Sequence, residues 1–347
     1  MKTTVLYAGL ANPHAGWVAI DELAEMLANY FEAEVLSPKP VPGTWHERLL
    51  HPHKVYYEPV QTTGGDLLIV VARWPADLGM IRSIPECRRK FSKIIGFVTD
   101  SYFKAGFVIE TEQFDAITVT AFEDIEYPYK RFGIPVHQLY QGADCLTWVP
   151  RVERQREIDV IGFGRTPPSY QACFSKRFHA PQSPILYLHS PLGNLGGDTV
   201  HLERGMLFKI LQRTRISLAF HLFVEPQEDR PRSMMVTSRW LESLLSGCIV
   251  VGRRPTSRMA DEMLSWPGAT TELSDDPSAA AQQLVNMLSA NDALEPQRRA
   301  NIYNTITMHD WRYRIKTLCD LFDWPVPLTL HDDIARLRDL STLYKPA

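Results

Sequence analysis

The stretch TSRWLESLLSGCIVVGRRP, from Thr237 to Pro255, predicts the fold of the second half of the chain. Its apolar spacing is that of a helix that begins after Thr237 or Ser238 and ends at Gly247. The apolar run at 248–251 follows at once and is typical of a buried strand. A helix that leads directly into a buried strand is the repeating unit of α/β domains, so the stretch favours that class.

The start of this helix carries side chains suited to a nucleotide. Ser238 and Arg239 fall in the first turn, where free backbone N–H groups and the helix dipole favour negative charge. One turn further on, the carboxylate of Glu242 offers two hydrogen-bond acceptors to a diol. Phosphate followed by diol is the order of groups in a nucleotide. The alternative is an ordinary surface helix in which Arg239 and Glu242 form a weak ion pair.

Short apolar runs recur along the whole chain, with amphipathic segments such as 18–31 and 277–290 between them. The predicted strands are 4–8, 67–71, 94–98, 116–119, 136–140, 158–161, 185–188, 216–220 and 248–251. Continuous apolar runs, without strict alternation, indicate strands buried on both faces of a parallel sheet. Strands that alternate with helices place the chain in the α/β class.

The strand pattern divides into two series at the turn-rich segment 139–150. REIDVIGFGR, residues 156–165, opens the second series much as 2–10 opens the first, and 347 residues suffice for two domains. We expect two Rossmann-like, doubly wound domains that face each other across a cleft. The predicted units are an N-terminal acceptor-side domain (1–148), a C-terminal donor domain (149–322) and a tail helix (323–347) that packs back on the N-terminal domain. Ligands of such sheets bind beyond the carboxyl ends of the strands.

The turn after the strand at 158–161 is a candidate phosphate site. Gly162 and Gly164 let backbone N–H groups approach a phosphate, and Arg165 supplies a forked cation. A glycine pair at a strand end also forms ordinary turns. Pro167-Pro168 stands in place of the third glycine of G-x-G-x-x-G, which disfavours a nicotinamide site.

Three further loops carry candidate side chains. Asp100 follows the run at 94–98, where a carboxylate is well placed to take a proton from a hydroxyl, or else it caps the next helix. His14 is the titratable side chain of the loop 9–17 and either acts directly or is a surface or capping residue. Glu225, in the long polar loop 224–235, either contacts a donor sugar or is a solvated surface residue.

Composition disfavours several classes of protein. A formal net charge of −3 argues against a dedicated nucleic-acid binder. No apolar run reaches the roughly 18 residues that span a bilayer, and the N-terminus lacks a signal-peptide pattern, so we expect a cytoplasmic protein.

The five cysteines form no C-x-x-C pair, and His51-Pro52-His53 lacks carboxylates in ligand spacing. We therefore expect reduced thiols and no metal site.

One cluster of basic residues is a candidate site for contact with a membrane surface. Arg88, Arg89, Lys90 and Lys93 surround Phe91. Such a cluster predicts peripheral contact with anionic lipid at the inner face of the membrane, and the alternative is a solvated charged face.

Taken together, these motifs resemble the glycosyltransferases of the GT-B fold, in particular the bacterial group 1 glycosyltransferases. The resemblance rests on the GFGR turn, the SRWLESLLSGCIVVG segment, the linker ending GADCLTWVP and the stretch HDWRYRIKTLCDLF from His309. It covers most of 144–322. The chain departs from the family in three places: the proline pair where many relatives have a lysine, the missing second glutamate before Glu242, and the missing glycine pair in the first loop.

The resemblance implies transfer of a sugar from a nucleotide-diphosphate sugar to a hydroxyl of a glycan or lipid-linked acceptor, as in polysaccharide biosynthesis, without a metal and with no cofactor besides the donor. It implies that Glu242 binds the ribose hydroxyls. Ser238, Arg239 and Arg165 would then meet the diphosphate. Asp100 would be the base of an inverting reaction, and the linker Asp144 would be structural. Two alternatives stay open: a nucleotide-sugar epimerase on the same fold, and an inactive nucleotide-sugar-binding protein.

Overall fold

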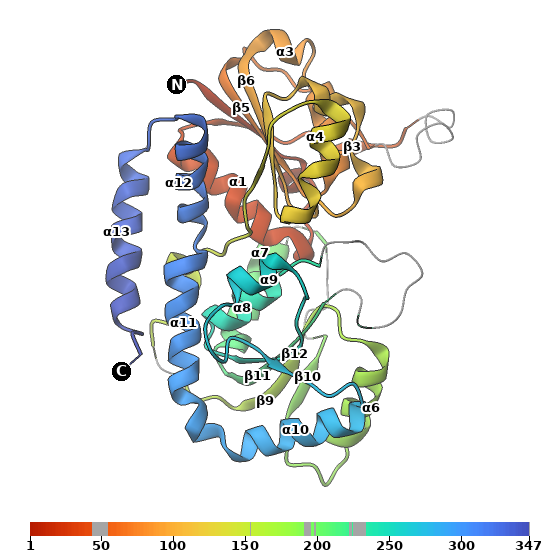
Figure 1. Cartoon of the computed structure of the whole chain (residues 1–347), viewed down its shortest axis with the longest axis vertical. Coiled ribbons are helices and arrows are strands. Elements are labelled where there is room, and N and C mark those ends of the chain that lie inside the picture. The colour runs from red at the N-terminus through yellow and green to blue at the C-terminus, as the bar shows by residue number, and fades with distance from the viewer. Residues whose placement is uncertain are drawn as a thin grey trace.

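The computed structural model describes residues 1–43, 55–152, 154–190, 196–197, 199–221, 224 and 234–346. It has two α/β domains stacked along the long axis of the molecule, with the last helices of the chain running along one side of both (Figure 1). The predicted class, two domains each built on a parallel sheet, is confirmed.

The N-terminal sheet has six parallel strands in the order β2-β1-β5-β6-β7-β8. Its strands are β1 (Thr3–Leu6), β2 (Glu34–Leu36), β5 (Gly65–Ala72), β6 (Phe91–Val98), β7 (Ala116–Val119) and β8 (Val136–Gln138). The helices of this half are α1 (Val18–Tyr30), α3 (Cys87–Lys90), α4 (Glu126–Phe132) and α5 (Cys145–Trp148). The 3-10 segments are η1 (Ala8–Ala11), η2 (Ala15–Trp17), η3 (Pro75–Ser83), η4 (Lys104–Gly106), η5 (Ile109–Gln113) and η6 (Phe122–Asp124). A separate antiparallel pair joins β3 (Pro40–Val41) to β4 (Tyr56–Tyr57).

The C-terminal sheet has five parallel strands in the order β10-β9-β11-β12-β13. Its strands are β9 (Ile158–Gly162), β10 (Tyr187–His189), β11 (Thr214–Phe220), β12 (Ile249–Arg253) and β13 (Thr271–Glu272). The helices are α6 (Pro168–Phe178), α7 (Val200–Leu211), α8 (Ser238–Leu245), α9 (Arg258–Met263), α10 (Pro277–Ser289), α11 (Glu295–His309), α12 (Trp311–Phe322) and α13 (Leu328–Thr342), with η7 (Asn291–Leu294) before α11.

The central strands bury both of their faces, as the continuous apolar runs predict. In β5, Leu67 and Ile69 lie in the cluster under α1, whereas Leu68 and Val70 lie in the cluster on the opposite face. All nine predicted strands are present, with ends that differ by a few residues. The sequence did not predict the edge strands β2 and β13. Both are short and largely exposed, so neither carries the apolar run that marks a buried strand.

The last two helices return to the N-terminal domain. Trp311, Ile315 and Leu318 of α12 lie in the same apolar cluster as the N-terminal strands, so α12 packs with the N-terminal domain although the predicted C-terminal domain extends to residue 322. In α13, Ile334 packs in that cluster and Leu337 packs in the cluster of the C-terminal domain. The side of the molecule formed by α11, α12 and α13 therefore braces both domains (Figure 1).

The basic cluster around Phe91 has a different setting from the predicted one. Phe91 is the first residue of β6 and is 2% exposed, so it cannot enter a membrane. Arg88 pairs with Asp115, and Arg89 pairs with Glu86. Two of the four basic side chains in the cluster, Arg88 and Arg89, are thus paired with nearby carboxylates.

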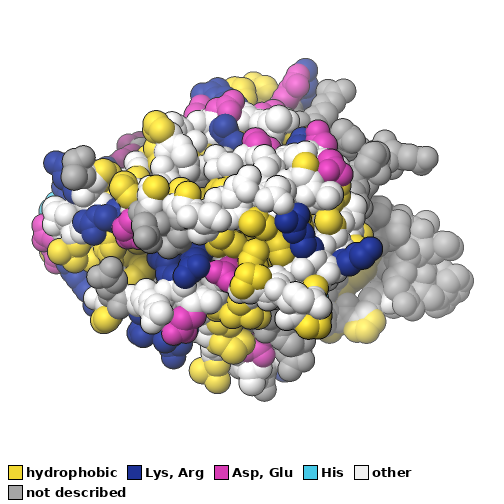
Figure 2. Space-filling model, turned by 90° about the horizontal axis from the view of Figure 1, so that it is seen from below, with side chains coloured by type: hydrophobic (Ala, Val, Ile, Leu, Met, Phe, Trp, Pro, Cys, Tyr) yellow, Lys and Arg dark blue, Asp and Glu magenta, His cyan; other side chains and the backbone are white. Residues whose placement is uncertain are grey.

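The end of the molecule that carries α10 also mixes the two signs of charge. Seen from the end that carries α10, basic and acidic side chains are interspersed with apolar ones (Figure 2). No helix among the described residues is long and apolar enough to cross a bilayer.

Candidate active site

Loops from the two sheets bring opposite charges close together between the domains. Asp100 lies two residues after β6, and Arg165 lies three residues after β9. The charge of Arg165 acts on Asp100, where it favours the ionised carboxylate. The predicted base and a predicted phosphate-binding residue thus lie at the carboxyl ends of two facing sheets, where ligands of such folds bind.

Asp100 has the protonation behaviour of a general base. Burial raises the pKa of its carboxyl to about 7, and Arg165 partly opposes that rise. Its backbone N–H donates to the carbonyl of Arg73 at 2.9 Å, which ties the loop after β6 to the loop after β5. The next helical segment, η4, has Phe103 at its N-cap, so Asp100 does not cap it. A carboxyl group that titrates near neutral pH can accept a proton there and release it again.

Arg239 is held against the GFGR turn. Its Nη1 donates to the carbonyl of Arg165 at 2.6 Å, and its guanidinium lies 5.8 Å from the centre of the Phe163 ring. Gly164 has a φ of +68°, and a Cβ at this position would lie 2.4 Å from Arg239 Nη2. Glycine at 164 therefore fits the left-handed backbone without strain, and it leaves the guanidinium of Arg239 where it lies.

The two arginines form a cationic corner. Within the described part of the chain, neither Arg165 nor Arg239 has a carboxylate partner in an ion pair. Burial and the charge of Arg165 lower the pKa of Arg239 to about 10, and Glu242 opposes this shift. Thr237 stands at the N-cap of α8 without a side-chain capping bond, so first-turn N–H groups remain available beside Ser238. Two forked cations at a helix start favour a phosphate ligand.

Glu242 does not lie on an open helix face. Its side chain is buried, and Oε1 accepts a hydrogen bond from Arg204 Nη1 of α7 at 2.6 Å. Ser246, one turn after Glu242, is fully buried as well. Glu242 therefore pairs with Arg204. It does not form the exposed ion pair with Arg239 that the sequence offered as an alternative. The cause of the pairing with Arg204 is the packing of α7 on α8, which the local sequence does not encode.

Two of the candidate residues have other settings. His14 is exposed and stands at the N-cap of η2, where its Nδ1 accepts from the Gly16 N–H at 3.1 Å. His14 therefore acts as a capping residue through this nitrogen, which was one of the two alternatives. Its backbone forms a β-bridge to Gly196 of the other domain. Glu225 lies outside the described residues, as do His51 and His53.

Asp144 has structural partners, as the resemblance implies. It accepts from the Thr147 N–H at the start of α5 and from Arg312 Nη1 of α12 at 2.9 Å. Arg312 also binds Asp310 and Asp333. These contacts join the interdomain linker to the HDWRYR stretch.

His309, at the start of that stretch, is buried as a neutral side chain. Burial and the charge of Arg314 lower the pKa of His309 to about 3, and its ring accordingly bonds to the carbonyl of Met263. The stretch that resembles a family helix therefore builds the joint between the domains.

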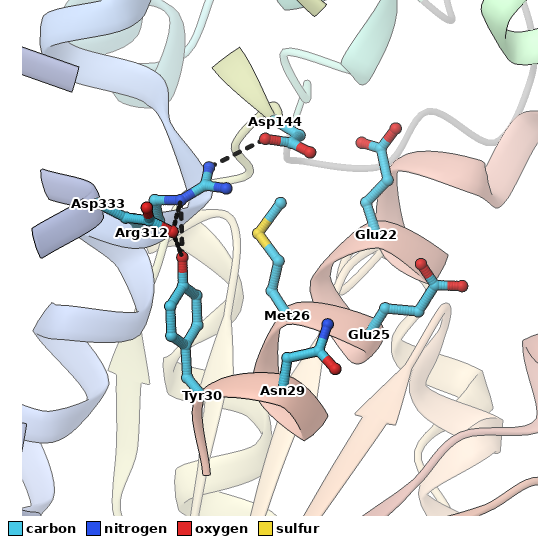
Figure 3. Close-up of a pocket in the computed structure, with 8 residues that line it drawn as sticks. All are labelled: Glu22, Glu25, Met26, Asn29, Tyr30, Asp144, Arg312 and Asp333. Carbon is cyan, nitrogen blue, oxygen red and sulfur yellow. Dashed lines mark hydrogen bonds and ion pairs between the residues drawn. The ribbon is translucent and has the colours of Figure 1, made fainter. Parts of the chain in front are cut away.

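A cavity of about 270 Å³ lies beside this joint (Figure 3). It is lined by Glu22, Glu25, Met26, Asn29, Tyr30, Asp144, Arg312 and Asp333. Glu22, Glu25, Met26 and Asn29 of α1 lie on one side of it, and Arg312 lies on the other with its hydrogen-bonded partners Tyr30, Asp144 and Asp333. None of the predicted donor or catalytic residues lines this cavity, so the proposed chemistry does not involve it.

Sequence reasoning missed the residues that bridge α1 and α7. Glu22 and Arg204 form an ion pair between the two domains, yet each sits in a segment that looks like an ordinary amphipathic helix. Glu203-Arg204 in particular has the composition of a solvated helix face. A buried arginine in such a pattern has no local signature, because only its distant partners distinguish it.

Comparisons with known proteins match part of the C-terminal half by sequence and most of the chain by structure. A model of a family described as glycosyl transferase-like matches residues 193–320. No curated protein matches the chain. Among solved structures, TarM is 10% identical with a TM-score of 0.48, and the match covers 74% of this chain and 54% of TarM. The calicheamicin glycosyltransferase CalG4 is 12% identical with a TM-score of 0.42, covering 91% and 97%. The UDP-GlcNAc 2-epimerase of Methanocaldococcus jannaschii is 9% identical with a TM-score of 0.42, covering 83% and 92%.

The chain spans about half the length of TarM. The family match contains α7, α8 and most of α12, the segment that holds Arg204, Arg239 and Glu242. Residues 193–320 thus match the model of a glycosyl transferase-like family, and they lie in a chain that has two parallel sheets.

Proposed function

We propose that this protein transfers a sugar from a nucleotide-diphosphate sugar to an acceptor hydroxyl, in the cytoplasm and without a metal. The observation that carries the proposal is the pair formed by Arg165, in the turn after β9, and Arg239, at the start of α8, near a half-buried Asp100 with a pKa of about 7. A cationic corner that faces a base is what glycosyl transfer requires, because negative charge grows on the leaving diphosphate while the acceptor loses a proton.

The donor occupies the C-terminal domain in this proposal. The diphosphate binds Arg165, Arg239 and the first-turn N–H groups beside Ser238, with Gly162 and Gly164 allowing close approach of the backbone. The ribose diol donates to the Glu242 oxygen that Arg204 does not hold. Glu225 remains a candidate for contact with the sugar.

The reaction then inverts the anomeric centre. Asp100 takes the proton of the acceptor hydroxyl as its oxygen forms a bond to the anomeric carbon, and the bond from that carbon to the diphosphate oxygen breaks. The electron pair leaves with the diphosphate, where the two guanidinium groups stabilise it. His14 is the second candidate for the base, through the ring nitrogen that is not used in the η2 cap.

An exposed aromatic pair beside Asp100 supports a glycan acceptor. Trp74 and Phe103 stack with their ring centres 6.3 Å apart and their planes at 26°. They are 41% and 39% exposed, yet the Trp74 indole N–H is anchored on the buried Asp77 at 2.8 Å. Arg73, whose carbonyl binds the Asp100 amide, directly precedes Trp74. A rigid aromatic surface open to water offers a platform for the apolar face of a sugar ring.

A panel of nucleotide-sugars tests the function directly. Each donor is incubated with and without methyl and p-nitrophenyl glycosides, and both the released nucleoside diphosphate and the sugar products are measured. Transfer that needs an acceptor supports the proposal. Conversion of the donor sugar to its epimer would identify an epimerase, and binding without turnover would identify an inactive binding protein.

Calorimetry with nucleoside diphosphates tests the donor site separately. Charge-assisted hydrogen bonds are worth about 1.5–3 kcal/mol, so Arg239→Ala and Glu242→Gln should each weaken binding by about ten- to a hundredfold. The matched control is Arg89→Ala, which removes an exposed guanidinium paired with Glu86. Wild-type affinity in both site variants would place the donor elsewhere.

Membrane contact, if the acceptor is lipid-linked, should be purely electrostatic. Phe91 is buried, so attraction to anionic lipid rests on Lys90 and Lys93 in addition to the paired arginines. We expect weak co-sedimentation with anionic vesicles at low salt and none at high salt. Binding that persists at high salt would require an apolar anchor elsewhere in the chain.

A further inference from the structure

Arg204 joins the two domains at the residue proposed to bind the ribose. From α7 its Nη2 and Nε form a fork on the Glu22 carboxylate of α1, with Nη2 to Oε2 at 3.0 Å. Its Nη1 donates to Glu242 Oε1 of α8 at 2.6 Å. One guanidinium is thus shared between a carboxylate of the N-terminal domain and a carboxylate of the C-terminal domain.

The surroundings of this guanidinium keep it in one place. Arg204 is 6% exposed, and its guanidinium lies 5.1 Å from the centre of the Phe208 ring. Phe208 stacks on Trp148 with ring centres 4.6 Å apart. The Trp148 indole N–H donates to Glu22 Oε1 at 2.7 Å, so the linker helix α5 also fixes the N-terminal partner. These contacts hold the guanidinium between the two carboxylates.

The charges in this bridge do not cancel. Two carboxylates share one cation. Burial alone would lower the pKa of Arg204, but Glu22 and Glu242 raise it overall. Burial raises the pKa of Glu22 against the opposing effect of Arg204. Because Arg204 gives most of its hydrogen bonds to Glu22, Glu242 keeps acceptor capacity for a ligand.

We propose that Arg204 is a positioning residue that couples binding of the donor nucleotide to closure of the two domains, with Glu22 as its contact in the N-terminal domain. The inference rests on the proposed function, since it takes Glu242 as the ribose ligand. When the domains close, Glu22 draws the guanidinium and leaves one Glu242 oxygen to the diol. When they separate, Arg204 turns fully onto Glu242 and makes it a poorer acceptor. Linkage makes the effect reciprocal, so bound nucleotide favours the closed form.

The variant Glu22→Gln tests this coupling without touching the donor site. It keeps the size of the side chain and removes its charge, whereas Arg204→Met would leave two carboxylates without their cation and is prone to misfold. The matched control is Glu25→Gln, the same change on the same helix at a residue exposed to water and without a bond to Arg204. Calorimetry with ADP, GDP, UDP, CDP and dTDP identifies the tightest ligand of the wild type, which then serves as the probe.

We expect Glu22→Gln to weaken the probe about five- to tenfold, and Glu25→Gln to leave it unchanged. In the Glu242→Gln background, Glu22→Gln should have no further effect, because the coupling passes through that carboxylate. X-ray scattering should show that the probe reduces the radius of gyration of the wild type and not that of Glu22→Gln.

Wild-type affinity in Glu22→Gln, or an equal loss in Glu25→Gln, would overturn the coupling while leaving the donor site intact. Wild-type affinity in Glu242→Gln would instead overturn the donor assignment of the proposed function, and the coupling with it. Lysine in place of Arg204 supplies a further readout. It keeps the charge but not the fork, so Arg204→Lys should retain part of the affinity and lose the compaction.

Discussion

At the scale of single residues, Asp100 lies where the proposed base should be, and its ionisation costs folding free energy. Its pKa of about 7 arises mainly from burial, with Arg165 opposing the rise. Folding therefore disfavours the charged form that the proposed reaction needs. Burial that raises the pKa of a carboxyl, opposed by a nearby cation that lowers it, is a common way for a protein to bring that pKa close to neutral pH.

Asp100→Asn should lower turnover by at least about a hundredfold, since it removes general-base assistance while keeping the size of the side chain. Affinity for the nucleoside diphosphate should be unchanged. In the wild type, kcat/KM should rise with pH through about 7 as the carboxyl loses its proton, and this rise should be absent from the variant. Normal turnover in Asp100→Asn together with an inactive His14→Ala would assign the base to His14.

The same substitution should raise the melting temperature at pH 8. The pKa of Asp100 is higher in the folded state than in the unfolded chain, where it is about 4. The ionised side chain therefore costs stability progressively as the pH rises through about 7, and asparagine removes that cost. Below pH 4 the carboxyl is protonated in both states, so the two proteins should melt alike. Calorimetric scans at both pH values check this.

At the scale of elements, the turn between β9 and α6 is shaped to receive Arg239. Gly164→Ala imposes a left-handed conformation on alanine and a Cβ that would lie 2.4 Å from the guanidinium. Gly133 is a matched control, with a φ of +67° and nothing within 4 Å of an added Cβ. Both variants should lose about 1 kcal/mol of stability from the backbone, but only Gly164→Ala should weaken nucleoside diphosphate binding. Equal affinities in the two variants would show that the position of Arg239 does not matter.

At the scale of the whole molecule, α12 makes the N-terminal domain depend on the end of the chain. Trp311 is fully buried among N-terminal strands and contacts Phe97 edge-on at 6.1 Å. Trp311→Ala should cost about 3–5 kcal/mol in the free energy of unfolding, measured with urea. Tyr129→Ala removes a ring that is 59% exposed and should cost about 0.5 kcal/mol or less. Similar losses in the two variants would mean that α12 is not part of the N-terminal core.

The sequence by itself determined the α/β class, all nine predicted strands, the loops that hold Asp100 and Arg165, and the helix start that holds Arg239. These follow from local rules: apolar runs mark buried strands, and ligands bind beyond the carboxyl ends of parallel strands. Only the tertiary structure decided that Glu242 faces Arg204 and that α12 packs with the N-terminal sheet. Glu22 and Arg204 are far apart in the sequence, and each lies in a helix with an ordinary amphipathic pattern. Local spacing records which face of a helix is buried, but which helix covers it depends on packing between distant segments.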